Sequence, residues 1–169
     1  MTAILLPVTG QTDVANRSFE DFTPGRRFTF KERTLTADEI IAFAREFDPQ
    51  PMHIDEAAGR ASILGGLAAS GWHTSAVMMR MLCEAYIDGS TSEGSPGVDL
   101  MEWKRPVLAG DTLGGHCEVL EARVSRSRPE IGIVRLRAEV TNQRGEIVAI
   151  SEYVNMMRLA GKDAAYADG

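Results

Sequence analysis

Two ionisable side chains, Asp48 and His53, stand close together in the segment FDPQPMHID. A carboxylate and an imidazole on a loop stiffened by Pro49 and Pro51 suit general acid–base catalysis. The reason is that an imidazole titrates near neutral pH and a neighbouring carboxylate can share a water molecule with it. The spacing also fits a plainer interpretation, in which Asp48 caps a turn and His53 is a satisfied surface or core histidine.

The small-residue segment GGLAASGW, residues 65–72, is the second candidate for chemistry. It leads into an apolar helix, and the N terminus of a helix offers backbone N–H groups with partial positive charge. Gly66 and Gly71 would let a ligand approach those amides, so the segment can hold a developing oxyanion. The glycines fit equally well a helix that packs closely against a sheet.

Other catalytic sets are poorly supported. The chain has only three histidines, and His73 and His116 lack nearby cysteines or paired acids, so we expect no metal site. Serines near the histidines have no GxSxG elbow and no third member for a hydrolase triad. We interpret His73, at the start of the apolar helix, as a structural or lining residue.

The composition predicts one folded domain of ordinary kind. The chain has 169 residues, 44% of them hydrophobic and 25% charged, which is typical of globular proteins. The net charge of -6 argues against a broad nucleic-acid surface. No stretch is long and apolar enough to span a membrane, and the N-terminal run is a poor signal peptide, so we expect a cytoplasmic protein.

Periodicity predicts the elements that position the candidate residues. We expect a strand over residues 28–35, and then a helix that begins with the capping box of Thr36 and Glu39 and ends before Pro49. Residues 48–70 should be irregular, with at most a short helix around 55–61. An apolar helix over 72–86 follows, and then strands over 98–104, 112–124, 131–141 and 147–157.

This order of elements predicts an α+β fold in which a mainly antiparallel sheet wraps one apolar helix. We expect residues 1–17 to be an N-terminal arm, residues 18–158 the single domain, and residues 159–169 a flexible tail.

The ordered set of segments resembles the MaoC-like dehydratases and (R)-specific enoyl-CoA hydratases, with the related NodN-like proteins. The matching parts are the Asp-x-x-Pro-x-His pattern ending at His53, the GGL and SGW segments, the apolar helix, and WKRPVLAGD at residues 103–111. The resemblance covers roughly residues 20–158.

The resemblance implies a hot-dog fold, with a five-stranded antiparallel sheet around a long central helix. It implies reversible hydration of a trans-2-enoyl-CoA to a 3-hydroxyacyl-CoA, with Asp48 and His53 as the catalytic pair. Gly71 matches the family's oxyanion glycine, and we expect Ser70, Gly66 and Trp72 to help bind the substrate. No cofactor is expected, since coenzyme A enters as part of the substrate. The expected assembly is a homodimer or higher homo-oligomer with the acyl-CoA tunnel at or beside the interface.

The loop departs from the commonest family pattern, because Gln50 stands where many hydratases have Asn, and Pro49 is added. This change indicates a different acyl group. Trp72 either reshapes the acyl pocket or is a large core anchor. Hot-dog proteins also include thioesterases and non-catalytic acyl-CoA-binding proteins, so both functions remain alternatives. A thioesterase would need Ser75 or Glu84 in the role of acid or nucleophile, and neither is persuasive.

Overall fold

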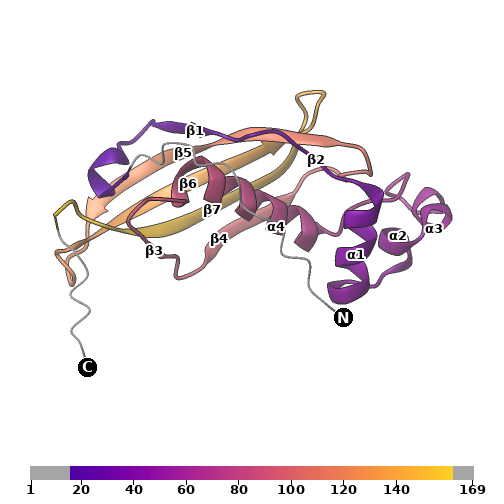
Figure 1. Cartoon of the computed structure of the whole chain (residues 1–169), viewed down its shortest axis with the longest axis horizontal. Helices are drawn as coiled ribbons and strands as arrows, with labels where there is room; N and C mark the ends of the chain where they lie inside the picture. The colour runs from indigo at the N-terminus through magenta and orange to yellow at the C-terminus, as the bar shows by residue number, and fades with distance from the viewer. Residues whose placement is uncertain (1–15, 162–169) are drawn as a thin grey trace.

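A curved antiparallel sheet of seven strands lies along one side of a helix, and three shorter helices form a lobe at one end (Figure 1). The structure is a computed structural model that describes residues 16–161. Five strands form the main path in the order β1 (Arg27–Thr29), β5 (Thr112–Val124), β6 (Ile131–Thr141), β7 (Ile147–Arg158) and β3 (Ser92–Gly94). Off this path, β2 (Arg33–Thr34) pairs with β5, and β4 (Val98–Trp103) pairs with β7.

The predicted strands are confirmed for the long members of the sheet, with one interruption. The strand expected over residues 28–35 is divided into β1 and β2. The break faces Gly115 of β5, whose φ of +125° departs from the extended conformation, and the pairing register shifts by one residue between the two segments. The short strand β3 was not predicted, because its sequence lies in a run of Gly, Ser and Thr that reads as a loop.

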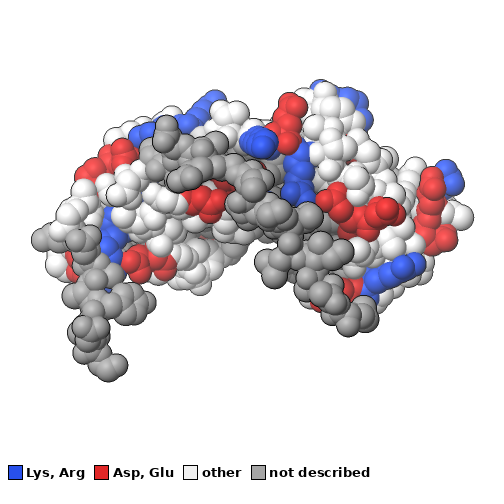
Figure 2. All heavy atoms as spheres, viewed as in Figure 1, with Lys and Arg blue, Asp and Glu red and all other residues white. Residues whose placement is uncertain are grey.

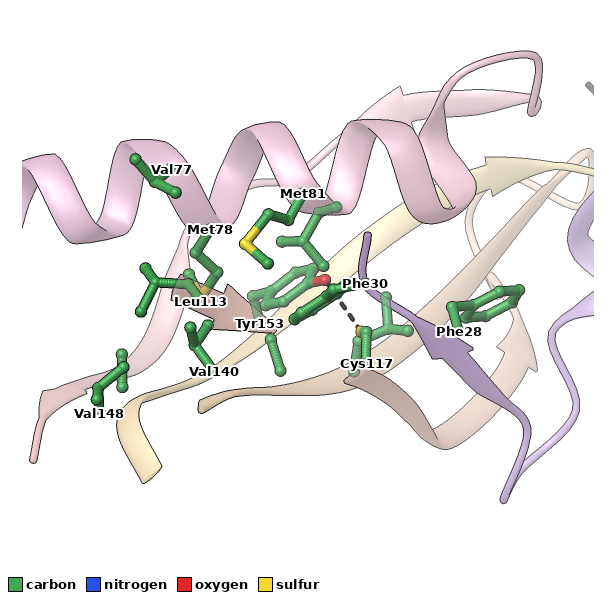
Figure 3. Close-up of a cluster of buried hydrophobic side chains, with 14 of the residues drawn as sticks. Phe28, Phe30, Val77, Met78, Met81, Leu113, Cys117, Val140, Val148 and Tyr153 are labelled. Carbon is green, nitrogen blue, oxygen red and sulfur yellow. Dashed lines mark hydrogen bonds between the residues drawn. The ribbon is translucent and has the colours of Figure 1, made fainter. Parts of the chain in front are cut away.

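Helix α4 (Gly71–Leu82) supplies the apolar face that the sheet covers. Its buried residues include Val77, Met78 and Met81, which face the inner side of the sheet at residues such as Val140 (Figure 3). Burying a side chain of this size stabilises the fold by about 1.5–3 kcal/mol. The helix predicted over residues 72–86 is therefore confirmed, although its last turn is a π-helix, η2 (Cys83–Ile87).

A cluster of three buried polar side chains lies at the π-helical end of this core. The Tyr86 and Tyr153 hydroxyls lie 3.1 Å apart. The Cys117 Sγ lies 3.4 Å from the Tyr153 hydroxyl (Figure 3). Burial raises the pKa of the Cys117 thiol to about 12. Burial raises the pKa of both tyrosines as well, so the three groups stay neutral and hold the sheet to the end of the helix.

The lobe contains α1 (Ala37–Phe47), α2 (Pro51–Ile54) and α3 (Glu56–Ala61). Helix α1 has the predicted capping box: the Glu39 N–H donates to Thr36 Oγ1 at 3.2 Å, and the Thr36 N–H donates to Glu39 Oε2 at 2.9 Å. Helix α2 was not predicted, because Pro49 and Pro51 favour a loop. Pro51 stands at its first turn, where the missing N–H costs no hydrogen bond.

Within residues 16–161, the first element is a 3-10 turn, η1 (Phe19–Asp21), and the last is β7. Most of the expected arm (1–17) and tail (159–169) lies outside the described residues. No helix within residues 16–161 is long and apolar enough to cross a membrane. On the face drawn in Figure 2, acidic and basic side chains alternate rather than separate into large patches.

Candidate active site

Asp48 stands at the C-terminal end of α1, where the chain turns into the rest of the lobe. Its N–H donates to the Ala44 carbonyl oxygen at 2.9 Å, which closes the last helical turn. The helix ends there because Pro49 disfavours the helical conformation of the residue before it. The Asp48 side chain is 18% exposed, so its carboxylate is partly screened from water while remaining reachable.

His53 lies on α2 and is buried, with 7% of its surface exposed. Its Nδ1 lies 2.8 Å from the Ala68 carbonyl oxygen. A carbonyl can only accept a hydrogen bond, so Nδ1 carries the proton. In the neutral ring, Nε2 is then left with a free lone pair. That Nε2 lies 3.7 Å from Asp48 Oδ2.

Ser70 connects this pair to the start of α4. As the N-cap of that helix, its Oγ accepts a hydrogen bond of 3.2 Å from the Trp72 N–H. The same hydroxyl donates to Asp48 Oδ2 at 2.6 Å. The residue expected to bind substrate thus contacts the carboxylate directly, and it fixes the distance between the lobe and the helix N terminus.

Gln50 holds the other oxygen of the same carboxylate, with Nε2 donating to Asp48 Oδ1 at 2.7 Å. The hydrogen bonds from Ser70 and then Gln50 are the main causes that hold the pKa of Asp48 below its usual value, while partial burial opposes them. Asp48 is therefore ionised at neutral pH. Gln50 is the residue that departs from the family pattern, and the sequence alone indicated no role for it in the site.

Ionised Asp48 and the Nε2 lone pair of His53 are two acceptors close enough for one water molecule to contact both. Such a pair can orient the water and take up its proton. The structure thus brings together the two residues that the sequence analysis singled out, and their catalytic role stays a prediction. Within residues 16–161, no group of three or more His, Cys, Asp or Glu side chains is arranged to hold a metal ion.

The three other predicted site residues, Gly71, Gly66 and Trp72, lie in different surroundings. Gly71 is the first residue of α4 and directly follows Ser70, whose hydroxyl contacts Asp48. Gly66 lies before the start of α4 and packs against α3. A Cβ added to Gly59 of α3 would lie 2.5 Å from the Gly66 carbonyl oxygen. Trp72 is 64% exposed, so it is not a core anchor.

The other two histidines lie apart from the pair. His73 is buried and stacks on Phe43 of α1, with ring centroids 4.6 Å apart and planes at 8°. Burial lowers the pKa of His73, so the ring stays neutral in this stack. It holds α1 against α4 and agrees with the structural interpretation. His116 lies on β5, opposite Thr29 of β1.

Both the sequence and the fold of this chain resemble those of known proteins. The family model described as "MaoC like domain" matches residues 19–142. The uncharacterized protein YdeM of Bacillus subtilis is 32% identical over 125 residues, which cover 74% of this chain and 87% of that protein.

Solved structures show the same architecture. A MaoC-like dehydratase from Rhodospirillum rubrum is 41% identical, with a TM-score of 0.76 over 83% of this chain and 97% of that one. The (R)-hydratase PhaJ1 from Pseudomonas aeruginosa is 23% identical, with a TM-score of 0.71 over 85% of this chain and 87% of that one. The expected hot-dog fold is confirmed, with two short strands beyond the five expected.

Proposed function

Because the chain belongs to the MaoC-like family, we propose that it is a hydro-lyase that reversibly hydrates a trans-2-enoyl-CoA to a 3-hydroxyacyl-CoA. The single observation that carries the proposal is the pairing of Asp48 with His53. Their Oδ2 and Nε2 atoms lie 3.7 Å apart, at the edge of the lobe that faces the start of α4. Structural neighbours with the same fold include proteins described as (R)-hydratases.

In the proposed reaction, Asp48 and His53 hold one water molecule between them. The water oxygen forms a bond to the β-carbon of the enoyl thioester, and the pair takes up the proton that the water loses. The pair then delivers a proton to the α-carbon, which leaves the two residues as they began. Microscopic reversibility makes the same groups sufficient for dehydration. The two groups titrate as a unit, so the proton is assigned to the pair.

Addition of water places negative charge on the thioester oxygen, as an enolate. In the proposal, the Gly71 N–H at the start of α4 donates to that oxygen. The first N–H groups of a helix have no partner within the helix, and they carry the positive end of its dipole. Donors that are already in place when the charge develops lower the barrier most.

The proposed assembly is a homodimer or a higher homo-oligomer. Its support is a set of large apolar side chains, each 45% to 64% exposed, on neighbouring surfaces of α4 and β4. They are Trp72, Met79, Val98 and Trp103. Strand β4 pairs with β7 on one edge, and within residues 16–161 no strand covers the other. Light scattering on the purified protein tests this assembly, and a molecular mass equal to one chain at micromolar concentration would contradict it.

The test of the reaction follows the loss of conjugated enoyl-thioester absorbance with a panel of enoyl-CoAs that differ in length and branching. Wild type should turn over at least one member. Asp48→Asn and His53→Ala should each lose at least about 100-fold in kcat, the range that general acid–base groups supply. Two matched controls, Asp38→Asn on the exposed start of α1 and His116→Ala on β5, should keep wild-type turnover.

The same assay separates the other functions of this fold. Release of free coenzyme A without hydration would replace the proposal with a thioesterase. Tight binding of acyl-CoA with no turnover of either kind would replace it with a binding protein. Full activity in both Asp48→Asn and His53→Ala would remove the pair from the mechanism.

A further inference from the structure

Trp103, the last residue of β4, covers the start of α4. A Cβ built on Gly71 would lie only 2.6 Å from Cδ2 and Cε2 of the Trp103 ring. The indole therefore rests on the Gly71 Cα, in space that any side chain at position 71 would need. This contact is the close packing of the helix against the sheet that was one of the two interpretations of Gly71.

The same indole also reaches the helix through a hydrogen-bonded relay. Trp103 Nε1–H donates to Ser75 Oγ at 3.2 Å, and Ser75 Oγ donates to the Gly71 carbonyl oxygen at 3.0 Å. Trp72 meets the Trp103 ring edge-on, with centroids 5.3 Å apart and planes at 77°. The first turn of α4 is thus held from β4 by the ring and the N–H of one side chain.

On its other side, this turn is held by the catalytic lobe. Ser70 Oγ donates to Asp48 Oδ2 and accepts from the Trp72 N–H. Gly71 therefore lies between two supports that come from distant parts of the chain: Asp48 acts through its neighbour Ser70, and Trp103 acts on the Gly71 Cα and, through Ser75, on the Gly71 carbonyl oxygen. The Trp103 side chain is 45% exposed, so burial alone does not explain why an indole occupies this place.

We propose that Trp103 is a positioning residue, which fixes the Gly71 amide at the distance and orientation needed to donate to the thioester oxygen. This inference rests on the proposed function, because it assigns Trp103 to the oxyanion donor of that reaction. The donor is the backbone N–H of a glycine, the residue whose side chain restrains the backbone dihedral angles least. The restraint must come from a neighbour, and Trp103 supplies it.

The consequence for catalysis is a loss that falls on kcat. An oxyanion donor acts mainly on the transition state, and removing one costs about 100- to 1,000-fold in kcat. Loosening a donor that remains present should cost less, about tenfold. If Trp103 were only a packing residue, its replacement would lower thermal stability, and kcat of the folded enzyme would be unchanged.

The experiment compares wild type with Trp103→Leu, which removes the aromatic face and the N–H, and with Trp103→Phe, which keeps a ring and removes only the N–H. Val124→Ala, at the far end of β5 and 43% exposed in the native protein, is the matched control for loss of an exposed apolar side chain. Two quantities are measured on each folded protein. One is kcat and KM for hydration, and the other is the infrared carbonyl stretch of a bound, carbon-13-labelled saturated acyl-CoA, which cannot be hydrated.

The expected result is that Trp103→Leu loses about tenfold in kcat, with KM within about threefold, and that the carbonyl stretch moves back toward its value in water. In Trp103→Phe, kcat should fall about threefold and the carbonyl stretch should move part of the way toward its value in water. Val124→Ala should match wild type in both quantities. The infrared measurement needs only binding, so it tests the positioning role even if wild type proves to hydrate none of the panel.

Unchanged kcat and carbonyl stretch in folded Trp103→Leu would overturn the inference and leave the hydratase proposal intact. If Trp103→Leu fails to fold, Trp103→Phe decides, and a wild-type stretch there overturns the relay through Ser75. A wild-type protein with a polarised carbonyl but no hydration would overturn the proposed function instead. Light scattering on each variant verifies that its assembly is that of wild type.

Discussion

The Ser70 hydroxyl and the Asp48 carboxylate lie 2.6 Å apart, and this hydrogen bond joins the end of one helix to the beginning of another. Asp48 is the C-cap of α1 and Ser70 is the N-cap of α4. The proposed acid–base group and the proposed oxyanion donor are therefore held in one unit, although 22 residues separate the two contacts along the chain.

Replacing Ser70 with alanine should raise the pKa of Asp48. The Ser70 hydroxyl is the largest cause of its lowered value, and without that donor the ionised form loses its best partner. A carbon-13 NMR titration of the aspartate carboxyl groups measures the change. Ser62→Ala, whose hydroxyl contacts the Gly59 carbonyl instead, is the control and should leave Asp48 unchanged. An Asp48 titration that is identical in Ser70→Ala and wild type would contradict this interpretation.

Stability in acid should depend on Asp48 in a defined direction. Its folded-state pKa lies below the ordinary value of 3.8, so ionised Asp48 stabilises the fold above that pH. This contribution is lost as the pH falls through the lowered, folded-state pKa. The free energy of unfolding of wild type minus that of Asp48→Asn should thus be constant from pH 7 to about 5 and shrink at lower pH. Urea titrations at several pH values measure it, and a difference that grows on acidification would contradict the assigned sign.

His53 should carry its proton on Nδ1 whenever the ring is neutral. The Ala68 carbonyl oxygen, 2.8 Å away, can only accept a hydrogen bond, and it therefore selects this tautomer. Nitrogen-15 NMR distinguishes the protonated from the unprotonated ring nitrogen. A neutral ring with its proton on Nε2 would remove the lone pair that faces Asp48, and the water-holding arrangement with it.

Gly71→Ala should destabilise the protein through its contact with Trp103. The added Cβ would lie 2.6 Å from the indole, and overpacking of this kind costs about 1–3 kcal/mol. The cost should fall sharply when Trp103→Ala removes the ring, so a double-mutant cycle measured by chemical unfolding should give a coupling of at least about 1 kcal/mol. Additive effects of the two substitutions would mean that the ring moves aside freely.

Much of the fold follows from local sequence signals. The alternation of apolar and polar residues in β6 predicted its bounds, since a strand with one buried face repeats every two residues. The capping box of Thr36 and Glu39 likewise predicted the start of α1, since both partners lie within one turn. The lobe was harder to predict, because Pro51 is compatible with both a loop and the first turn of α2.

The supporting residues of the site were beyond local signals. Asp48 and His53 were singled out because their types suit acid–base chemistry and because the segments around them resemble the family pattern. Trp103 meets Ser75 across 28 residues, and its contact depends on the pairing of β4 with β7, which no pattern in the sequence predicts. Gln50 carried a signal, its departure from the family's Asn, but the signal did not say that its amide would hold the Asp48 carboxylate.

The pairing of β1 with β5 bears on the order in which the molecule folds. Arg27 and Glu118 are paired across 91 residues, and the segment between them contains every α-helix of residues 16–161. The hairpins β5–β6 and β6–β7, in contrast, close through short turns. Long-range contacts form slowly, because closing a large loop costs chain entropy before any contact compensates for it. The three long strands are therefore expected to associate early, and the β1–β5 pairing, which closes the segment that carries the lobe and α4, is expected to form late.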